Sequence, residues 1–169
     1  SDDIQLHAVL RQTLNLKGLK YVRTIRKAPE AIYNGEEDFS KGFVELKSGE
    51  DLVIIATGIM VASCLRIANE LSKQGLDIGV VDLFRVKPLP EELLALYRGL
   101  PILSVENHNQ IGGIGSALCE LFSTDLNTPV FRMGIQERFG QVGKVDFLLQ
   151  DYGLDEASIK DKILSILHY

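Results

Sequence analysis

Residues 52–58 read Leu-Val-Ile-Ile-Ala-Thr-Gly. An unbroken apolar run of this length predicts a strand that is covered on both faces, as strands of parallel sheets usually are. The glycine then makes the turn into a helical pattern over residues 61–74, and Gly75 ends that helix. The stretch therefore predicts the first strand and the first helix of an α/β sheet.

The same alternation continues to the end of the chain. Strands are predicted over residues 52–57, 77–84, 101–105 and 128–132, and helices over 61–74, 90–97, 111–123, 145–150 and 156–167. Asp155 is placed to be the N-cap of the last helix. Strands that alternate with helices predict βαβ units, and hence a mainly parallel, doubly wound sheet with helices on both faces over residues 43–169.

The first 25 residues have a different pattern from the rest of the chain. Apolar residues between Ile4 and Leu16 recur at helical spacing, Gly18 ends that helix, and residues 19–25 alternate as in a strand. One helix and one strand are too little to bury a hydrophobic face. Either they pack on the main domain, or they are the end of a domain whose beginning is missing.

Residues 27–42 differ in composition from both neighbours. They contain Pro29, Gly35 and Gly42 around an acidic cluster at residues 36–38, which is typical of a linker or a long loop. We therefore expect a fragment over residues 1–33, a linker over 34–42 and one domain after it.

The overall composition excludes several classes of protein. The 169 residues are 46% hydrophobic and 24% charged, as in ordinary globular domains, and the formal net charge of −5 argues against a nucleic-acid surface. No apolar run approaches the roughly 18 residues of a membrane span, and the acidic, polar N-terminus is unlike a secretory signal. Cys64 and Cys119 both lie among apolar residues of predicted helices, which favours buried, reduced thiols and a cytoplasmic location.

Two strand ends are candidate sites, because ligands of open α/β sheets lie beyond the carboxyl ends of the strands. At the first, Thr57 and Gly58 lead straight into a helix whose free N–H groups suit an anion; a tight turn that needs glycine is the alternative. No Gly-x-Gly-x-x-Gly or P-loop motif occurs, so nucleotide binding has little support.

The second candidate is the loop from Val105 to Gly115. Glu106 ends a strand and could accept bonds from neighbouring N–H groups, while Gly113 and Gly115 allow a close approach of the backbone. Ordinary packing of a surface loop is the alternative. His108 is the only histidine in such a position, and one histidine without suitably spaced cysteines does not make a zinc site.

A third feature is the pair Arg23 and Arg26, with Lys27 beside them. Guanidinium groups at the exit of a strand suit the bidentate geometry of phosphate monoesters. The alternative is a solvated basic edge.

Several segments, taken in order, resemble the C-terminal domain of the transketolase family. They are residues 49–58 with Val61 and Ala62, residues 81–89, the glutamate loop with its Gly112-Gly113 pair, and Arg138-Phe139-Gly140 followed by leucines 148, 149 and 154 and by Ile159. Pro90 stands where the family usually has an acidic residue after the Lys-Pro-Leu turn. The resemblance covers nearly the whole chain.

The resemblance gives the opening residues a role. Residues 1–33 are similar to the final helix and strand of the family's pyrimidine-binding domain. Arg26 then matches the arginine that binds the sugar-phosphate substrate, and Arg23 has a looser counterpart in deoxyxylulose-phosphate synthase. Ile25 and Lys27 flank Arg26 where transketolases tend to have serine and glutamine, a difference that bears on the substrate. Glu106 and His108 are candidates for a loop near the active site or an interface.

The resemblance implies a parent enzyme of the pentose-phosphate type, a homodimer that moves a two-carbon ketol unit between sugar phosphates with thiamine diphosphate and Mg²⁺. The family's Gly-Asp-Gly motif and activating glutamate do not occur in this chain, so we expect neither cofactor to bind it alone. The rest of the thiamine-binding machinery is then the expected partner, as further domains or an N-terminal subunit. The alternatives are a portion of deoxyxylulose-phosphate synthase or of a 2-oxo-acid dehydrogenase β subunit, or a non-catalytic module for assembly or anion binding.

Overall fold

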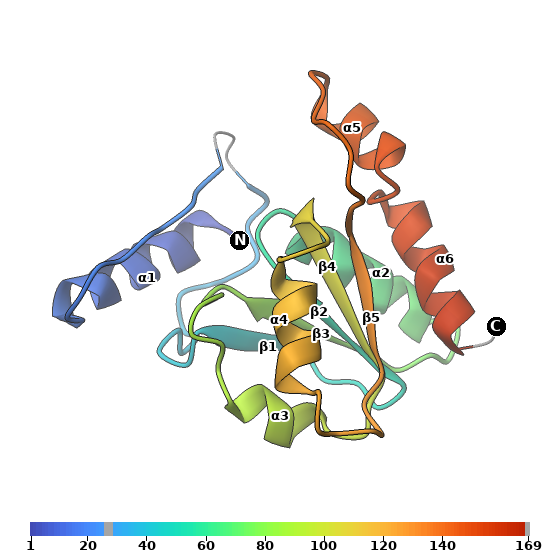
Figure 1. Cartoon of the computed structure of the whole chain (residues 1–169), viewed down its shortest axis with the longest axis horizontal. Coiled ribbons are helices and arrows are strands. Elements are labelled where there is room, and N and C mark those ends of the chain that lie inside the picture. The colour runs from blue at the N-terminus through green and yellow to red at the C-terminus, as the bar shows by residue number, and fades with distance from the viewer. Residues whose placement is uncertain (26–28, 168–169) are drawn as a thin grey trace.

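The computed structural model describes residues 1–25 and 29–167. Its elements are α1 (Asp3–Asn15), β1 (Phe43–Lys47), β2 (Leu52–Ala56), α2 (Met60–Ser72), β3 (Ile78–Leu83), α3 (Glu92–Tyr97), β4 (Ile102–Asn109), α4 (Ile114–Leu121), β5 (Val130–Ile135), α5 (Val145–Asp151) and α6 (Glu156–Leu167). The five strands form one sheet in the order β1-β3-β2-β4-β5, in which only β1 is antiparallel to its neighbour (Figure 1). None of the described helices is both long and apolar enough to cross a membrane.

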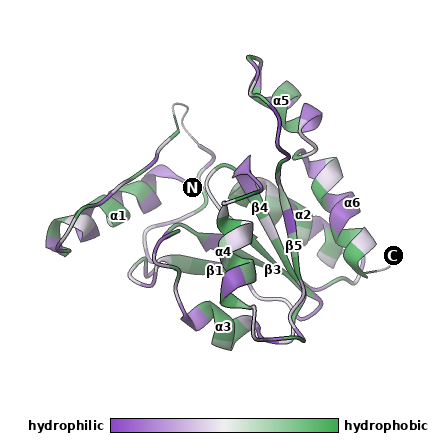
Figure 2. Cartoon of the chain, in the orientation of Figure 1, coloured by the Kyte–Doolittle hydropathy of each residue, from purple (hydrophilic) through white to green (hydrophobic). Residues whose placement is uncertain are grey.

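Successive side chains of the central strand β2 point alternately into two hydrophobic cores. Leu52 and Ile54 point to the face that α2 and α6 cover, whereas Val53 and Ile55 point to the face covered by α3 and α4. All five residues of β2 are buried, and Figure 2 shows that hydrophobic residues are concentrated on the central strands. The prediction of a mainly parallel sheet with helices on both faces is confirmed.

The strand β1 was not predicted. It pairs antiparallel with β3, with Phe43 opposite Leu83 and Val44 opposite Asp82, and its register shifts between Glu45 and Lys47. The segment is short and only partly buried, because it lies at the edge of the sheet. Its mixed sequence therefore lacks the continuous apolar run by which the inner strands were found.

The prediction of a strand over residues 19–25 is wrong. These residues run back alongside α1 without joining any strand (Figure 1), and Leu19 and Tyr21 are almost fully exposed. A period of two in the sequence fits an extended backbone, but a strand also needs a neighbour that supplies the ladder of hydrogen bonds. The described part of the chain supplies none to this segment.

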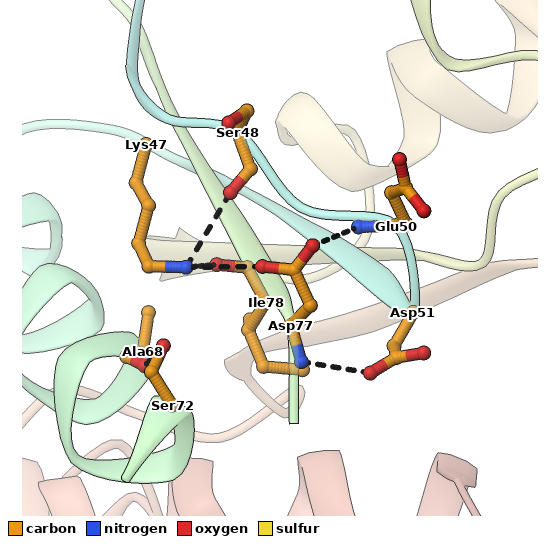
Figure 3. A network of polar contacts seen from close by, with 8 residues as sticks. All are labelled: Lys47, Ser48, Glu50, Asp51, Ala68, Ser72, Asp77 and Ile78. Carbon is orange, nitrogen blue, oxygen red and sulfur yellow. Dashed lines mark hydrogen bonds and ion pairs between the residues drawn. The ribbon is translucent and has the colours of Figure 1, made fainter. Parts of the chain in front are cut away.

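The amino ends of the strands are held by a polar network that contains no candidate site (Figure 3). The Lys47 ammonium donates to the carbonyl of Ile78 at 2.9 Å. The carboxylate of Asp77 accepts from the N–H of Glu50 at 3.1 Å, and the N–H of Asp77 donates to Asp51 at 2.7 Å. These bonds tie the loop between β1 and β2 to the start of β3, so the network fixes the strands relative to one another.

Candidate functional site

The carboxyl end of β4 and the start of α4 are organised around a buried carboxylate. Glu106 and His108, which were predicted to lie in a loop, belong to the last part of β4. Glu106 is only 1% exposed. Its two carboxylate oxygens accept hydrogen bonds from the N–H groups of Ile114 at 2.9 Å and Gly115 at 3.0 Å. These groups belong to the first turn of α4, where backbone N–H groups have no partner within the helix and a negative charge is favoured. The expectation that Glu106 accepts from neighbouring N–H groups is confirmed.

Gly113 makes this arrangement sterically possible. A Cβ atom at this position would lie 2.1 Å from Oε2 of Glu106, which is closer than atoms can approach. The glycine therefore lets the carboxylate reach the start of the helix, as the close approach predicted for this loop requires. Glu106 in turn stabilises the end of the sheet on which Asn107 and His108 lie.

Arg23 lies against this same loop. Its Nη2 atom donates a long hydrogen bond of 3.5 Å to the carbonyl of Asn107. His108 is exposed, and its Nδ1 lies 3.0 Å from the carbonyl of Asn109. The structure thus brings Arg23 to the carboxyl end of β4, which contains Glu106 and His108, whereas Arg26 lies outside the described residues.

The turn after β2 is a tight turn that needs glycine. Gly58 has a φ of 59°, in the left-handed region that other residues rarely adopt, and its carbonyl accepts from the N–H of Val61 at 3.2 Å. Beside it is a pocket of about 180 Å³ whose lining includes Ile59, Glu30 and Arg66. The guanidinium of Arg66 pairs with Glu30 and with Glu156. The guanidinium that lines this pocket is therefore already paired with two carboxylates.

A second buried carboxylate, Asp82, was missed by the sequence analysis. It lies at the carboxyl end of β3 and is fully buried. Its Oδ2 accepts from Nε2 of Gln5 at 2.6 Å and from the hydroxyl of Tyr33 at 2.7 Å. Burial raises the pKa of Asp82, because the charged form is removed from water. The only signal in the sequence was an acidic residue inside the apolar run 78–84.

The two cysteines lie on helices, as predicted. Cys64 of α2 is buried and Cys119 of α4 is half-buried, and both thiols are free. Burial raises the pKa of the Cys64 thiol well above its ordinary value. Its thiolate is therefore disfavoured, and it packs as a small apolar side chain.

The sheet order, the helices on both faces and the polar groups at the carboxyl ends of the strands define a doubly wound α/β domain. Residues 42–159 match the family model described as "Transketolase, C-terminal domain". Because this match covers more than half of the chain, the protein belongs to the transketolase family. The resemblance seen in the sequence is confirmed.

Individual relatives agree with this assignment. A "Putative transketolase C-terminal section" of Methanocaldococcus jannaschii is 39% identical over 92% of this chain and 50% of its own length. A 1-deoxy-D-xylulose-5-phosphate synthase of Bacillus velezensis is 38% identical over 70% of this chain and 19% of its own length. A solved structure described as "Split gene transketolase, inactive beta4 tetramer" has a TM-score of 0.92 and 31% identity over 99% of this chain and 56% of its own. The chain thus spans half or less of the length of these curated relatives.

Proposed function

We propose that this chain is the C-terminal portion of a transketolase-type enzyme that transfers a two-carbon ketol unit between sugar phosphates. Within that enzyme it serves assembly and completes the substrate site, where Arg26 and, to a lesser degree, Arg23 bind the phosphate of the sugar. The observation that carries the proposal is the position of Arg23 against the main chain of Asn107, at the carboxyl end of β4. This is the edge at which open α/β sheets bind their ligands.

The charge of the opening residues supports a phosphate partner. Residues 4–28 contain six basic side chains and no acidic one, in a chain whose net charge is −5: Arg11, Lys17, Lys20, Arg23, Arg26 and Lys27. Arginine binds phosphate through two parallel hydrogen bonds, which fixes orientation as well as adding affinity. The phosphate of the sugar is remote from the reacting carbon. An arginine that binds this phosphate therefore helps to position the carbonyl for attack.

The cofactor belongs to other parts of the assembly. Thiamine diphosphate with Mg²⁺ supplies the carbanion and the electron sink of ketol transfer when it is bound. We assign none of its ligands to this chain. The residues of this chain bind and orient the substrate phosphate, and they hold Glu106 and His108 at the carboxyl end of β4.

The partner we propose is the remaining thiamine-binding portion of the enzyme, either on the same polypeptide or as a separate subunit. In this arrangement residues 1–33 are the end of a pyrimidine-binding domain, residues 34–42 are the linker and residues 43–169 are the C-terminal domain. The exposed apolar side chains at Leu14, Leu19 and Tyr21 support this division, because they need a partner surface that the described chain does not offer. The complete enzyme is proposed to be a homodimer in the cytoplasm.

Two alternatives remain in the same family, and one outside catalysis. Similarity to a deoxyxylulose-phosphate synthase keeps that activity as the second candidate. A 2-oxo-acid dehydrogenase β subunit is the third. In all of these the chain contributes the same domain, whereas a module for assembly or anion binding would contribute no residue to a reaction.

The experiment is reconstitution with the thiamine-binding portion of the parent. The two parts are mixed with thiamine diphosphate and Mg²⁺, and three reactions are measured in parallel: ketol transfer from a ketose phosphate to an aldose phosphate, condensation of pyruvate with glyceraldehyde 3-phosphate, and decarboxylation of 2-oxo acids. We expect ketol transfer that requires both parts. Activity of the thiamine-binding portion alone at the same rate would contradict the proposal, and activity in another assay would select the corresponding alternative.

A further inference from the structure

One carboxylate oxygen of the sheet accepts hydrogen bonds from two side chains that precede β1. Oδ2 of Asp82 accepts from the side-chain amide of Gln5, on α1, and from the hydroxyl of Tyr33, on the loop before β1. Gln5 and Tyr33 are 77 and 49 residues away from Asp82 in sequence. Three segments that are remote along the chain therefore meet at a single buried atom.

A second carboxylate locks the two donors to each other. The side chain of Asp2 accepts from the N–H of Gln5 at 2.9 Å, and from the N–H groups of Ile32 and Tyr33 at 2.9 Å each. The start of α1 and the loop that contains Tyr33 are thus held as one unit. The side chains of that unit then reach Asp82.

Aromatic packing continues the contact toward the sheet. The ring of Tyr33 meets that of Phe39 edge to face, with 4.9 Å between centroids, and Phe39 meets Phe84 in the same manner at 5.9 Å. Phe84 follows β3 directly and is separated from Asp82 only by Leu83, so the aromatic contacts end close to Asp82 in the sequence. Such pairs favour one relative orientation of the rings.

Stability alone does not account for an acid at this position. Asp82 shares the face of β3 with Ile78 and Val80, both fully buried in an apolar core. Its Oδ1 is buried and has no hydrogen-bond partner among the described residues. Burial raises the pKa of Asp82 although the amino-terminal ammonium of Ser1 and the hydrogen bonds of Tyr33 and Gln5 favour the charged form, so burying this carboxylate costs more than these contacts return. An apolar residue of similar size would not carry this cost. The carboxylate does, however, select one orientation, because only that orientation satisfies both Gln5 and Tyr33.

We propose that Asp82 is a positioning residue: through Gln5 and Tyr33 it fixes the orientation of residues 3–25, and with them Arg23, on the carboxyl edge of the sheet. Asp82 pairs in register with Ala56 of β2, which in turn pairs with Val105 immediately before Glu106. Asp82 and the end of β4 that Arg23 contacts therefore lie on the same edge of the sheet, two strands apart. The significance of this for substrate binding rests on the proposed function, but the positioning itself does not.

The first test uses the chain alone and measures amide hydrogen exchange in the variants Asp82→Ala, Asp82→Asn and Tyr33→Phe. The alanine variant leaves both donors without an acceptor, so exchange in α1 is expected to become faster by about tenfold or more, while β2 and β4 keep their protection. The asparagine variant keeps a carbonyl oxygen at the junction and should stay close to the wild type. Tyr33→Phe removes one of the two bonds and should show a smaller effect confined to the same segment.

The matched control is Glu30→Gln. Glu30 also ties the opening segment to the domain, through Arg66, but that contact is exposed, and exposed ion pairs contribute little. No change in α1 exchange is expected. Faster exchange of β2 and β4 together with α1 in the Asp82→Ala variant would show that Asp82 supports the core as a whole and would overturn the proposal. If that variant does not fold, an unchanged α1 in Tyr33→Phe would overturn it instead.

The second test uses the reconstituted enzyme. Asp82→Ala is expected to raise KM for a phosphorylated donor severalfold, with little change in KM for an unphosphorylated one, and Asp82→Asn is expected to restore the wild-type value. Equal changes for both donors would contradict a role in placing Arg23. If the wild-type assembly shows no ketol transfer, the proposed function fails, whereas the exchange measurement still decides whether Asp82 orients the segment.

Discussion

The sheet domain (residues 43–169) and the opening segment (residues 1–33) differ in how far their apolar side chains are buried. In the sheet domain, residues such as Ile54 and Leu103 are fully buried between helices on both faces. In the opening segment, Leu14 is 84% exposed and Tyr21 is 89% exposed. The sheet domain therefore has a core of its own, while many apolar side chains of α1 and of residues 16–25 are exposed. The difference supports the proposal that another part of the enzyme covers the opening segment.

The largest effect that separates the two regions is expected from truncating one apolar side chain in each. Ile54→Ala removes a fully buried side chain from the central strand and should lower the free energy of unfolding by about 2–5 kcal/mol. Leu14→Ala is the matched change in the opening segment and should alter it by less than about 0.5 kcal/mol. Urea denaturation followed by circular dichroism measures both. A comparable loss in the two variants would mean that α1 shares the core of the domain.

A smaller effect is expected at the loop after β4. Gly113→Ala places a Cβ atom 2.1 Å from Oε2 of Glu106, so the carboxylate must withdraw from the start of α4. Loss of those hydrogen bonds should cost about 1–3 kcal/mol. Gly140→Ala serves as the control, because no atom lies within 4 Å of a Cβ there. Equal midpoints of denaturation for Gly113→Ala and the wild type would show that Glu106 does not depend on this glycine.

The stability of α1 is expected to depend on pH through the carboxylate of Asp2. Burial alone would raise the pKa of Asp2, but the hydrogen bonds from Gln5, Tyr33 and Ile32 outweigh it and lower that pKa. A lowered pKa means that the stabilisation is present above the unfolded value of about 4 and is lost as pH falls below it. Asp2→Ala, which removes the N-cap of α1, should therefore reduce the protection of α1 by about 0.5–2 kcal/mol at pH 6, and the difference from wild type should shrink toward pH 2. Hydrogen exchange as a function of pH measures it; a difference that grew with acid would contradict the assignment.

The smallest effect is expected when the cofactor is added to the purified chain. Neither region contains a Gly-Asp-Gly motif, so titration of thiamine diphosphate and Mg²⁺ into the purified chain should give no binding heat. The same titration into the reconstituted assembly is the positive control. Binding to the chain alone with a dissociation constant in the micromolar range would place cofactor ligands in this chain and would require a different division of the enzyme.

The sequence was a good guide where structure depends on neighbours along the chain. The run 52–57 predicted a buried strand because continuous apolar residues require cover on both faces. The link between Glu106 and Gly115 could be anticipated because the two residues are only 9 apart and a helix start offers free N–H groups. These local relations also sufficed to predict the helices on both faces.

The remainder depended on contacts between remote residues. The alternation at residues 19–25 did not reveal that the segment lacks a strand neighbour, and the partly exposed edge strand β1 had no continuous apolar run. Asp82 was visible as an acid in an apolar segment, but nothing local indicated that Gln5 and Tyr33 would meet it. Junctions of this kind are set by tertiary packing and become apparent only from coordinates.

We propose that the opening segment contributes Arg26 to the substrate site as a phosphate-binding residue. The most direct measurement compares kcat/KM of Arg26→Ala and wild type in the reconstituted enzyme, with one phosphorylated and one unphosphorylated donor. Hydrogen bonds to a charged group contribute about 1.5–3 kcal/mol each, so a loss of about tenfold to a few hundredfold is expected for the phosphorylated donor alone. Arg23→Ala should show a smaller loss with the same selectivity, and cofactor affinity should not change. Equal losses for both donors would contradict the claim and would make Arg26 a structural residue.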